Sequence, residues 1–262
     1  HKNLIPDINL TPYSIWLATV VVSGISYLSY LLKRYVFHES GTLVSGIIGG
    51  LYSSTATISV LARKSRKASE QEATDYVAAM LLAVSMMFLR FMILILIFSR
   101  EIFLSIYPYL LTMAVVAAIV AWFIHSRQKR PEDQPAEIEE DDSSNPLEFK
   151  VALIFAVLFV IFTFLTHYTL VYAGTGGLNL LSFVSGFSDI TPFILNLLQN
   201  TGSVAALIIT ACSMQAIISN IMVNMFYALF FAGKGSKLRP WILGGFGVVI
   251  ACNLVLLLFF YI

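Results

Sequence analysis

The sequence predicts an all-α polytopic membrane protein, and three observations support this fold class. The chain of 262 residues is 58% hydrophobic and only 12% charged, whereas soluble domains carry about 25% charged residues. Its mean hydropathy is +0.83. Apolar runs long enough to cross a bilayer recur along the whole chain, and spanning backbone must be helical because lipid cannot satisfy its polar groups.

Eight apolar segments are predicted to form these helices, and each has at least the roughly 20 residues that a spanning helix needs. They cover residues 13–32, 43–62, 76–98, 102–125, 148–172, 178–198, 203–232 and 241–262. A stretch between the fourth and fifth segments is first basic and then acidic, contains prolines, and cannot form a core. We therefore expect a first transmembrane repeat over residues 1–126, a flexible charged linker over 127–147 and a second transmembrane repeat over 148–262.

Two glycine-containing segments, 41–55 and 177–191, indicate that the two groups are diverged copies of one another. The equivalent positions, at an offset of 136 residues, are Gly41 with Gly177 and Gly50 with Gly186. A further match, of residues 85–90 with 219–224, has an offset of 134. Each copy is then predicted to hold three spanning helices and one Gly-interrupted segment. Corresponding interrupted segments in the two halves of a membrane protein point to a transport site.

The distribution of Lys and Arg favours a re-entrant path for both interrupted segments, because basic residues collect on the cytoplasmic side. If all eight segments cross, nine basic residues fall on one side and six on the other. If the interrupted segments return to the side that they left, 13 share one side and only Lys2 and Arg100 remain opposite. Three crossings per repeat then make the repeats inverted. A parallel arrangement of four plus four spans stays open, since both interrupted segments are long enough to cross.

Asp189 is the only carboxylate in the interior of an apolar segment. A charge at the bilayer centre costs at least about 2.5–3.5 kcal/mol, so such a residue is expected to face a cavity or a partner. The sequence over 188–192, Ser-Asp-Ile-Thr-Pro, is typical of a helix start with Ser or Asp as N-cap. Asp189 is therefore either an ion- or proton-binding residue or a helix cap that pairs with Arg90. Beyond the cap, Asn196 and Asn200 are expected to share one helical face with Asp189.

Other polar side chains are expected to supply oxygen ligands to the same ion. They follow Gly49 and Gly50, lie in the predicted helix start at 188–192 or form a stripe on the seventh segment. They are Ser53, Ser54, Thr55, Thr191, Asn220 and Asn224. If a helix restarts after Gly49 and Gly50, its free N–H groups and hydroxyls would form an ion site, although hydroxyls in apolar helices also bond back to the i−4 carbonyl. Gly46 and Gly50 have the spacing of close helix packing. Arg90 is predicted to be the charge partner or gate that favours the charged form of Asp189.

Several other classes of function lack their motifs. Intramembrane aspartyl proteolysis needs two facing carboxylates, and neither a nucleophile motif near His167, a Walker A loop nor a zinc spacing is present. Cys212 and Cys252 lie in apolar segments without metal-ligand spacing. The sequence therefore predicts neither an enzyme, a cofactor nor a nucleic-acid partner, and leaves any bound metal unknown.

Motifs in both halves resemble the uncharacterised C-terminal transmembrane domain of bacterial MgtC/SapB-like membrane proteins. In the first half they are Gly-Gly-Leu-Tyr-Ser-Ser-Thr-Ala-Thr at 49–57 and Ala-Arg-Lys-Ser-Arg at 62–66; in the second they are Gly-Phe-Ser-Asp-Ile-Thr at 186–191 and Ser219-Asn220. The resemblance implies a multi-pass protein of the bacterial inner membrane, connected with magnesium or general ion homeostasis, with an MgtC-like module upstream in a longer chain. It supplies no mechanism. One departure is Asn224, where the relatives have Lys.

From these patterns we expect a transporter or channel for a small inorganic ion, with a cation favoured, and a midplane site at the repeat interface. The alternative is a non-transporting membrane module that regulates a partner protein. The expected partners are the lipid bilayer and the ion, and a homo-oligomer is compatible with this interpretation. Divalent cations usually take more than one carboxylate, so a single Asp beside an Arg fits a monovalent ion or a proton at least as well.

Overall fold

The computed structural model describes residues 11–36, 41–66, 68, 70–127, 149–199, 204–233 and 236–261. This part of the chain is helical, without strands. Its elements are α1 (Pro12–Leu31), the π-helical turn η1 (Leu32–Val36), α2 (Thr42–Lys64), α3 (Glu70–Phe98), α4 (Arg100–Ser126), α5 (Phe149–Ser185), α6 (Ile190–Gln199), α7 (Ala206–Ala232) and α8 (Arg239–Tyr261). Seven of these helices are long and apolar enough to cross a membrane, whereas α6 has only ten residues. The predicted linker over 127–147 lies almost entirely outside the described residues.

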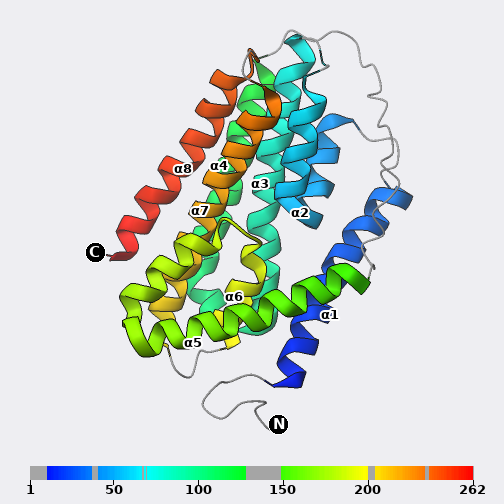
Figure 1. Cartoon of the computed structure of the whole chain (residues 1–262). Helices are drawn as coiled ribbons and strands as arrows, with labels where there is room; N and C mark the ends of the chain where they lie inside the picture. Colours follow the sequence, from blue (N-terminus) through cyan, green and yellow to red (C-terminus); the bar gives the residue numbers. More distant parts are fainter. Residues whose placement is uncertain are drawn as a thin grey trace.

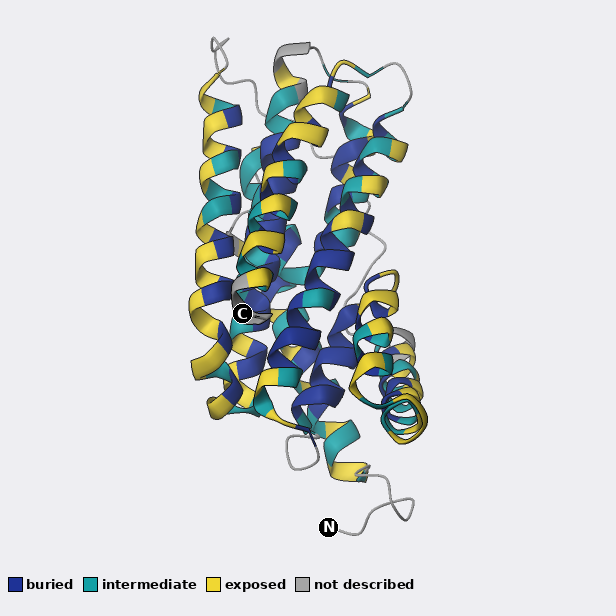
Figure 2. Ribbon diagram, turned by 90° about the vertical axis from the view of Figure 1, so that its left-hand side faces the viewer, coloured by how far each residue is buried: buried dark blue, intermediate teal, exposed yellow. Residues whose placement is uncertain are grey.

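The helices α3, α4, α7 and α8 run side by side and form a bundle (Figure 1). The ends that join α2 to α3 and α7 to α8 lie at its upper end, and the link between α3 and α4 lies at its lower end (Figure 1). Large side chains such as Phe88, Leu110 and Phe246 fill the interior. The outward faces are exposed and apolar (Figure 2), as at Trp122 and Leu258. An apolar surface of this extent is expected where lipid is the solvent.

The helix α2 reverses its direction at Ser53, whose φ of −158° and ψ of 109° are not helical. A Cβ atom built on Gly49 would lie 2.5 Å from Oγ1 of Thr57. In a straight helix, residues eight positions apart are separated by about 12 Å along the axis. The two halves of α2 therefore form a hairpin, and both ends of α2 lie toward the upper end of the bundle (Figure 1).

Close glycine contacts hold the descending half of α2 against α3. A Cβ on Gly46 would lie 2.3 Å from the backbone O of Ala79, and one on Gly50 would lie 2.5 Å from Cα of Ala83. The expectation that these two glycines serve helix packing is confirmed. The helix breaks at Ser53 rather than directly after Gly49 and Gly50.

The helix α5 reverses its direction at Gly174, which has a φ of 59°. A Cβ on Gly177 would lie 2.8 Å from Cγ2 of Thr169, again eight positions away. The first part of α5 crosses the lower part of the bundle at a large angle to the other long helices (Figures 1 and 2). The predicted segment 178–198 is thus divided between the end of α5 and the short α6.

The end of α5 rises along α7 from the lower end of the bundle, and α6 returns to it. Sγ of Cys212, near the start of α7, donates a hydrogen bond to Oδ1 of Asn179 at 3.4 Å. Farther along both helices, Oγ of Ser219 donates to the carbonyl of Phe183 at 2.7 Å. At the far end of α6, Nε2 of Gln199 lies 3.4 Å from the carbonyl of Ser14 in the first turn of α1. The end of α5 and α6 therefore form a second hairpin, which enters from the end opposite to α2.

Candidate functional site

The tips of the two hairpins lie halfway along spanning helices. The first tip comprises residues 52–54 and the second comprises residues 186–189. Gly50, just before the first tip, packs on Ala83 of α3, and Gly186 packs on Ser219 of α7, with a built Cβ only 2.4 Å from its side chain. Ala83 and Ser219 are each the fourteenth residue of their helices, which have 29 and 27 residues. Both breaks in the helical backbone thus lie near the middle of the bundle.

Arg90 of α3 binds the first tip. Its Nη1 donates a hydrogen bond to the carbonyl of Tyr52 at 2.6 Å. That carbonyl ends the descending half of α2 and has no helical N–H to accept from, because the break follows it directly. Oγ of Ser53 accepts from the N–H of Ala56 at 3.3 Å and so caps the ascending half. Arg90 is only 9% exposed, and its Nε has no partner among the described residues.

Two asparagines of α7 form a chain of hydrogen bonds that begins at the second tip. Nδ2 of Asn220 donates to the carbonyl of Gly186 at 3.3 Å. Oδ1 of Asn220 accepts from Nδ2 of Asn224 at 3.2 Å. The chain of bonds stops there, because Oδ1 of Asn224 is buried and has no partner within the described part of the chain. An unsatisfied buried polar group costs about 1–3 kcal/mol, so Oδ1 of Asn224 and Nε of Arg90 are groups that a ligand could satisfy.

Asp189 is the N-cap of α6. Its Oδ1 accepts from the N–H of Thr191 at 2.9 Å, as the sequence over 188–192 predicts. The carboxylate is exposed rather than enclosed by neighbours. It lies within electrostatic range of Arg90, but the two side chains form no direct ion pair. The predicted pairing therefore exists only as a longer-range interaction.

The remaining predicted ligands lie near the tips, in different surroundings. Ser54 and the side chain of Thr191 are buried. Thr55 lies one residue beyond the first tip, and its carbonyl accepts from Oγ of Ser59 at 2.8 Å. No contact joins the hydroxyls of one tip to those of the other. The structure thus gathers the predicted residues into two clusters, connected by the interaction of Arg90 with Asp189.

Asp189 and Asn196, two of the three residues predicted to share a polar helical face, lie in different surroundings. Asn196 is buried, and its Nδ2 donates to Oγ1 of Thr163 on α5 at 2.7 Å. It therefore joins α6 to α5, whereas Asp189 is exposed at the tip. Asn200 lies outside the described residues.

Two features of the tips could not be predicted from the sequence. The first is the carbonyl of Tyr52, which accepts from Arg90. No side chain in the sequence indicates this role, because a backbone carbonyl becomes available only where the helix breaks. The second is Ser219, which belongs to a motif used above for the family resemblance, but only the packing of Gly186 reveals its contact with the second hairpin. Two further buried hydroxyls of α7, those of Thr210 and Ser213, have no hydrogen-bond partner among the described residues and lie nearer the lower end of the bundle.

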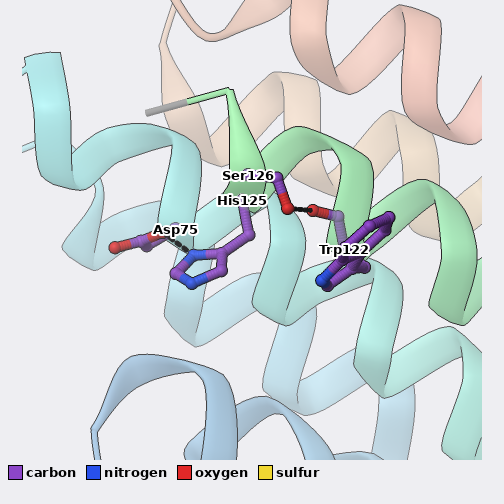
Figure 3. A network of polar contacts seen from close by, with 4 residues as sticks. All are labelled: Asp75, Trp122, His125 and Ser126. Atoms are coloured by element: carbon purple, nitrogen blue, oxygen red, sulfur yellow. Dashed lines mark hydrogen bonds and ion pairs between the residues drawn. The ribbon is translucent and has the colours of Figure 1, made fainter. Parts of the chain in front are cut away.

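A separate polar contact joins α3 to α4 near the upper end of the bundle (Figure 3). Nδ1 of His125 and Oδ1 of Asp75 are 2.7 Å apart, and both side chains are partly exposed. In the same turn of α4, Oγ of Ser126 donates to the carbonyl of Trp122 at 2.8 Å. Neither of these two contacts involves a residue of the tips. Within the described residues, moreover, no group of three or more His, Cys, Asp or Glu side chains could hold a metal ion.

The fold and its apolar helices define a multi-pass membrane protein. The chain belongs to the DUF4010 family, a domain of unknown function, which matches residues 20–232 and so includes both tips. It is similar to an "Uncharacterized protein" of Aquifex aeolicus (strain VF5), at 25% identity over 227 residues that cover 84% of this chain and 96% of the relative. No solved structure matches. The link to MgtC/SapB-like proteins stays a prediction.

Proposed function

We propose that this protein is a transporter or channel for a small inorganic ion, which binds between the two hairpin tips near the membrane midplane. The observation that carries the proposal is the approach of two broken helices from opposite ends of the bundle to one level. Arg90 and Asp189 lie within electrostatic range there, without a direct ion pair. Discontinuous helices whose ends meet near the midplane are the usual construction of ion and substrate sites in secondary transporters.

The proposal includes two inverted repeats. In support, the contacts of Gly50 with Ala83 and of Gly186 with Ser219 are related by the same offset of 136 residues. The hairpins also pack across the two halves, α2 on α7 and α6 on α3. In this alignment the counterpart of Ser219 is Ala83, so the offset of 134 used for residues 85–90 is not followed, and Asn224 is not the counterpart of Arg90.

We expect the ion to be a cation. Asp189 offers an exposed carboxylate, and Asn224 offers a buried carbonyl oxygen without a partner. Because the described residues contain no cluster of carboxylates, a monovalent cation or a proton fits better than a divalent metal. A small anion is the second candidate, favoured by the unpartnered Nε of Arg90.

We place the upper end of the bundle in the cytoplasm, and the protein in the bacterial inner membrane. Six described basic residues lie at this end, namely Arg63, Lys64, Arg66, Arg127, Lys237 and Arg239, against Arg100 at the lower end. Such an excess is typical of the cytoplasmic side.

The test is ion flux into liposomes that contain the purified full chain. Asp189→Asn keeps the helix cap but removes the charge, and Arg90→Gln removes the opposite charge. Both are expected to reduce flux by more than ten-fold relative to wild type. Parallel experiments with Na⁺, K⁺, a pH gradient and Cl⁻ identify the transported ion and distinguish the cation hypothesis from the anion hypothesis.

Two matched controls carry the same chemical changes outside the tips. Asp75→Asn and Arg100→Gln are expected to leave flux unchanged, since both residues lie at the ends of the bundle. Arg90→Lys tests whether charge alone suffices should Arg90→Gln fail to fold. Absence of flux from the wild type with every ion would refute transport and favour the regulatory module, and unchanged flux in Asp189→Asn would exclude this carboxylate.

A further inference from the structure

A cavity of about 1080 Å³ lies at the upper end of the bundle, far from the tips. One wall is formed where α2 ends and α3 begins, and the other where α7 ends and α8 begins. None of the described residues that line it is acidic. Three of them are basic, and they are Arg66, Lys237 and Arg239. The lining therefore carries net positive charge.

The cavity has an aromatic side as well as a basic one. Phe226 and Phe230 of α7 line it with ring centroids 6.1 Å apart, and they are 60% and 62% exposed. Phe226 lies one helical turn nearer the middle of the bundle, so the two rings extend the lining along α7 toward the membrane interior. Trp241 of α8 also lines the cavity and is partly exposed, as is usual for tryptophan at a membrane interface.

Hydrogen bonds hold the basic side in position. The guanidinium of Arg66 donates from Nε to the carbonyl of Phe231 and from Nη2 to that of Phe230, the latter at 3.2 Å. These carbonyls belong to the last turn of α7, where cations are favoured. The guanidinium of Arg63 lies 4.3 Å from the ring centroid of Phe231. Two arginines are thus anchored to the end of α7 at or beside the cavity.

We propose that this cavity binds one anionic phospholipid, with the phosphate at the basic side and an acyl chain along Phe226 and Phe230. Charge complementarity selects an anionic headgroup, because the described lining residues include three cations and no acid. The aromatic strip selects a lipid over a free phosphate, which would gain nothing from apolar surface. Basic pockets between helices at the cytoplasmic face are a known mode of anionic lipid binding.

Trp241 supplies an intrinsic reporter. In the full chain with Trp16→Phe and Trp122→Phe, it is the only tryptophan left. Phosphatidylglycerol brominated on its acyl chains is titrated into the detergent-solubilised protein, and brominated phosphatidylcholine is titrated in parallel. We expect saturable quenching of Trp241 by the phosphatidylglycerol at a much lower mole fraction, with an affinity that falls as salt is added.

The decisive variant is Lys237→Gln combined with Arg239→Gln, which leaves the bonds of Arg66 intact. At about five-fold for each basic residue near the membrane surface, affinity for phosphatidylglycerol should fall by about 25-fold. Arg127→Gln is the matched control, because Arg127 lies at the same end but outside the cavity, and its affinity should equal that of wild type. Equal quenching by the two lipids, or wild-type affinity in the double variant, would overturn the proposal. Full competition by millimolar glycerol phosphate would show that the occupant is a soluble anion instead.

Discussion

Gly49 and Thr57 allow a direct test of the chain reversal that brings the first tip to mid-depth. A Cβ atom on Gly49 would lie 2.5 Å from Oγ1 and 2.8 Å from Cγ2 of Thr57. Relief of these contacts requires a displacement of about 1 Å toward the optimum of 3.5–4.0 Å. Such overpacking costs about 1–3 kcal/mol, whereas the replacement of glycine by alanine in a helix gains about 1 kcal/mol. Gly49→Ala alone should therefore range from neutral to destabilising by about 2 kcal/mol.

Thr57→Ala removes both clashing atoms and leaves only Cβ, at 3.2 Å. In that background Gly49→Ala should be neutral or stabilising, and the double-mutant cycle should give a coupling free energy of about 1–3 kcal/mol. The measurement is the free energy of unfolding of the four proteins in mixed micelles. Gly24→Ala serves as the control partner for Thr57→Ala, because a Cβ on Gly24 has no neighbour within 4 Å. A coupling below about 0.5 kcal/mol would mean that the two residues do not touch, and the reversal at Ser53 would be refuted.

Three further predictions concern topology and stability. In a background without native cysteines, Gly41→Cys and Ala68→Cys should react with an impermeant thiol reagent from one face of the membrane and Arg100→Cys from the other; labelling of the first two from opposite faces would contradict the hairpin. Asp189→Asn should change the free energy of unfolding by less than about 0.5 kcal/mol, since Asn also caps helices, whereas Asp189→Ala should cost about 1 kcal/mol; equal losses in the two variants would mean that the charge stabilises the fold. Tyr109→Phe should lower the free energy of unfolding by about 1–3 kcal/mol, because its buried hydroxyl donates to Oδ1 of an asparagine on α8 that would lose its partner; unchanged stability would show that this bond contributes nothing.

The local signals of the sequence predicted several features of the site correctly. An acid followed two positions later by threonine and then by proline predicts a capped helix start, and Asp189 caps α6 in this way. The spacing of Gly46 and Gly50 predicts close packing, and both lie against the backbone of α3. These signals depend on a few neighbouring residues, so they can be interpreted without knowledge of the rest of the fold.

Other features depended on groups far apart in the chain. Gly50 is compatible with either a break or a packing surface. In the structure it packs on Ala83, and the backbone angles place the break farther on, at Ser53. Asn196 has the spacing of a site residue, yet it bonds to Thr163 because α5 passes beside α6. The intramembrane charges of Arg90 and Asp189 suggested a pair, but the first takes a backbone carbonyl and the second a backbone N–H.

The amino-acid sequence by itself determined the class of the protein, its apolar segments and the approximate places where the helices break, because hydropathy and backbone preference are properties of short stretches. Only the tertiary structure decided that the chain turns back at Ser53 and Gly174, and that the two tips reach the same depth. A break permits any change of direction. The direction taken depends on which helix surface receives the next segment, and α3 and α7 provide those surfaces from positions distant in the sequence.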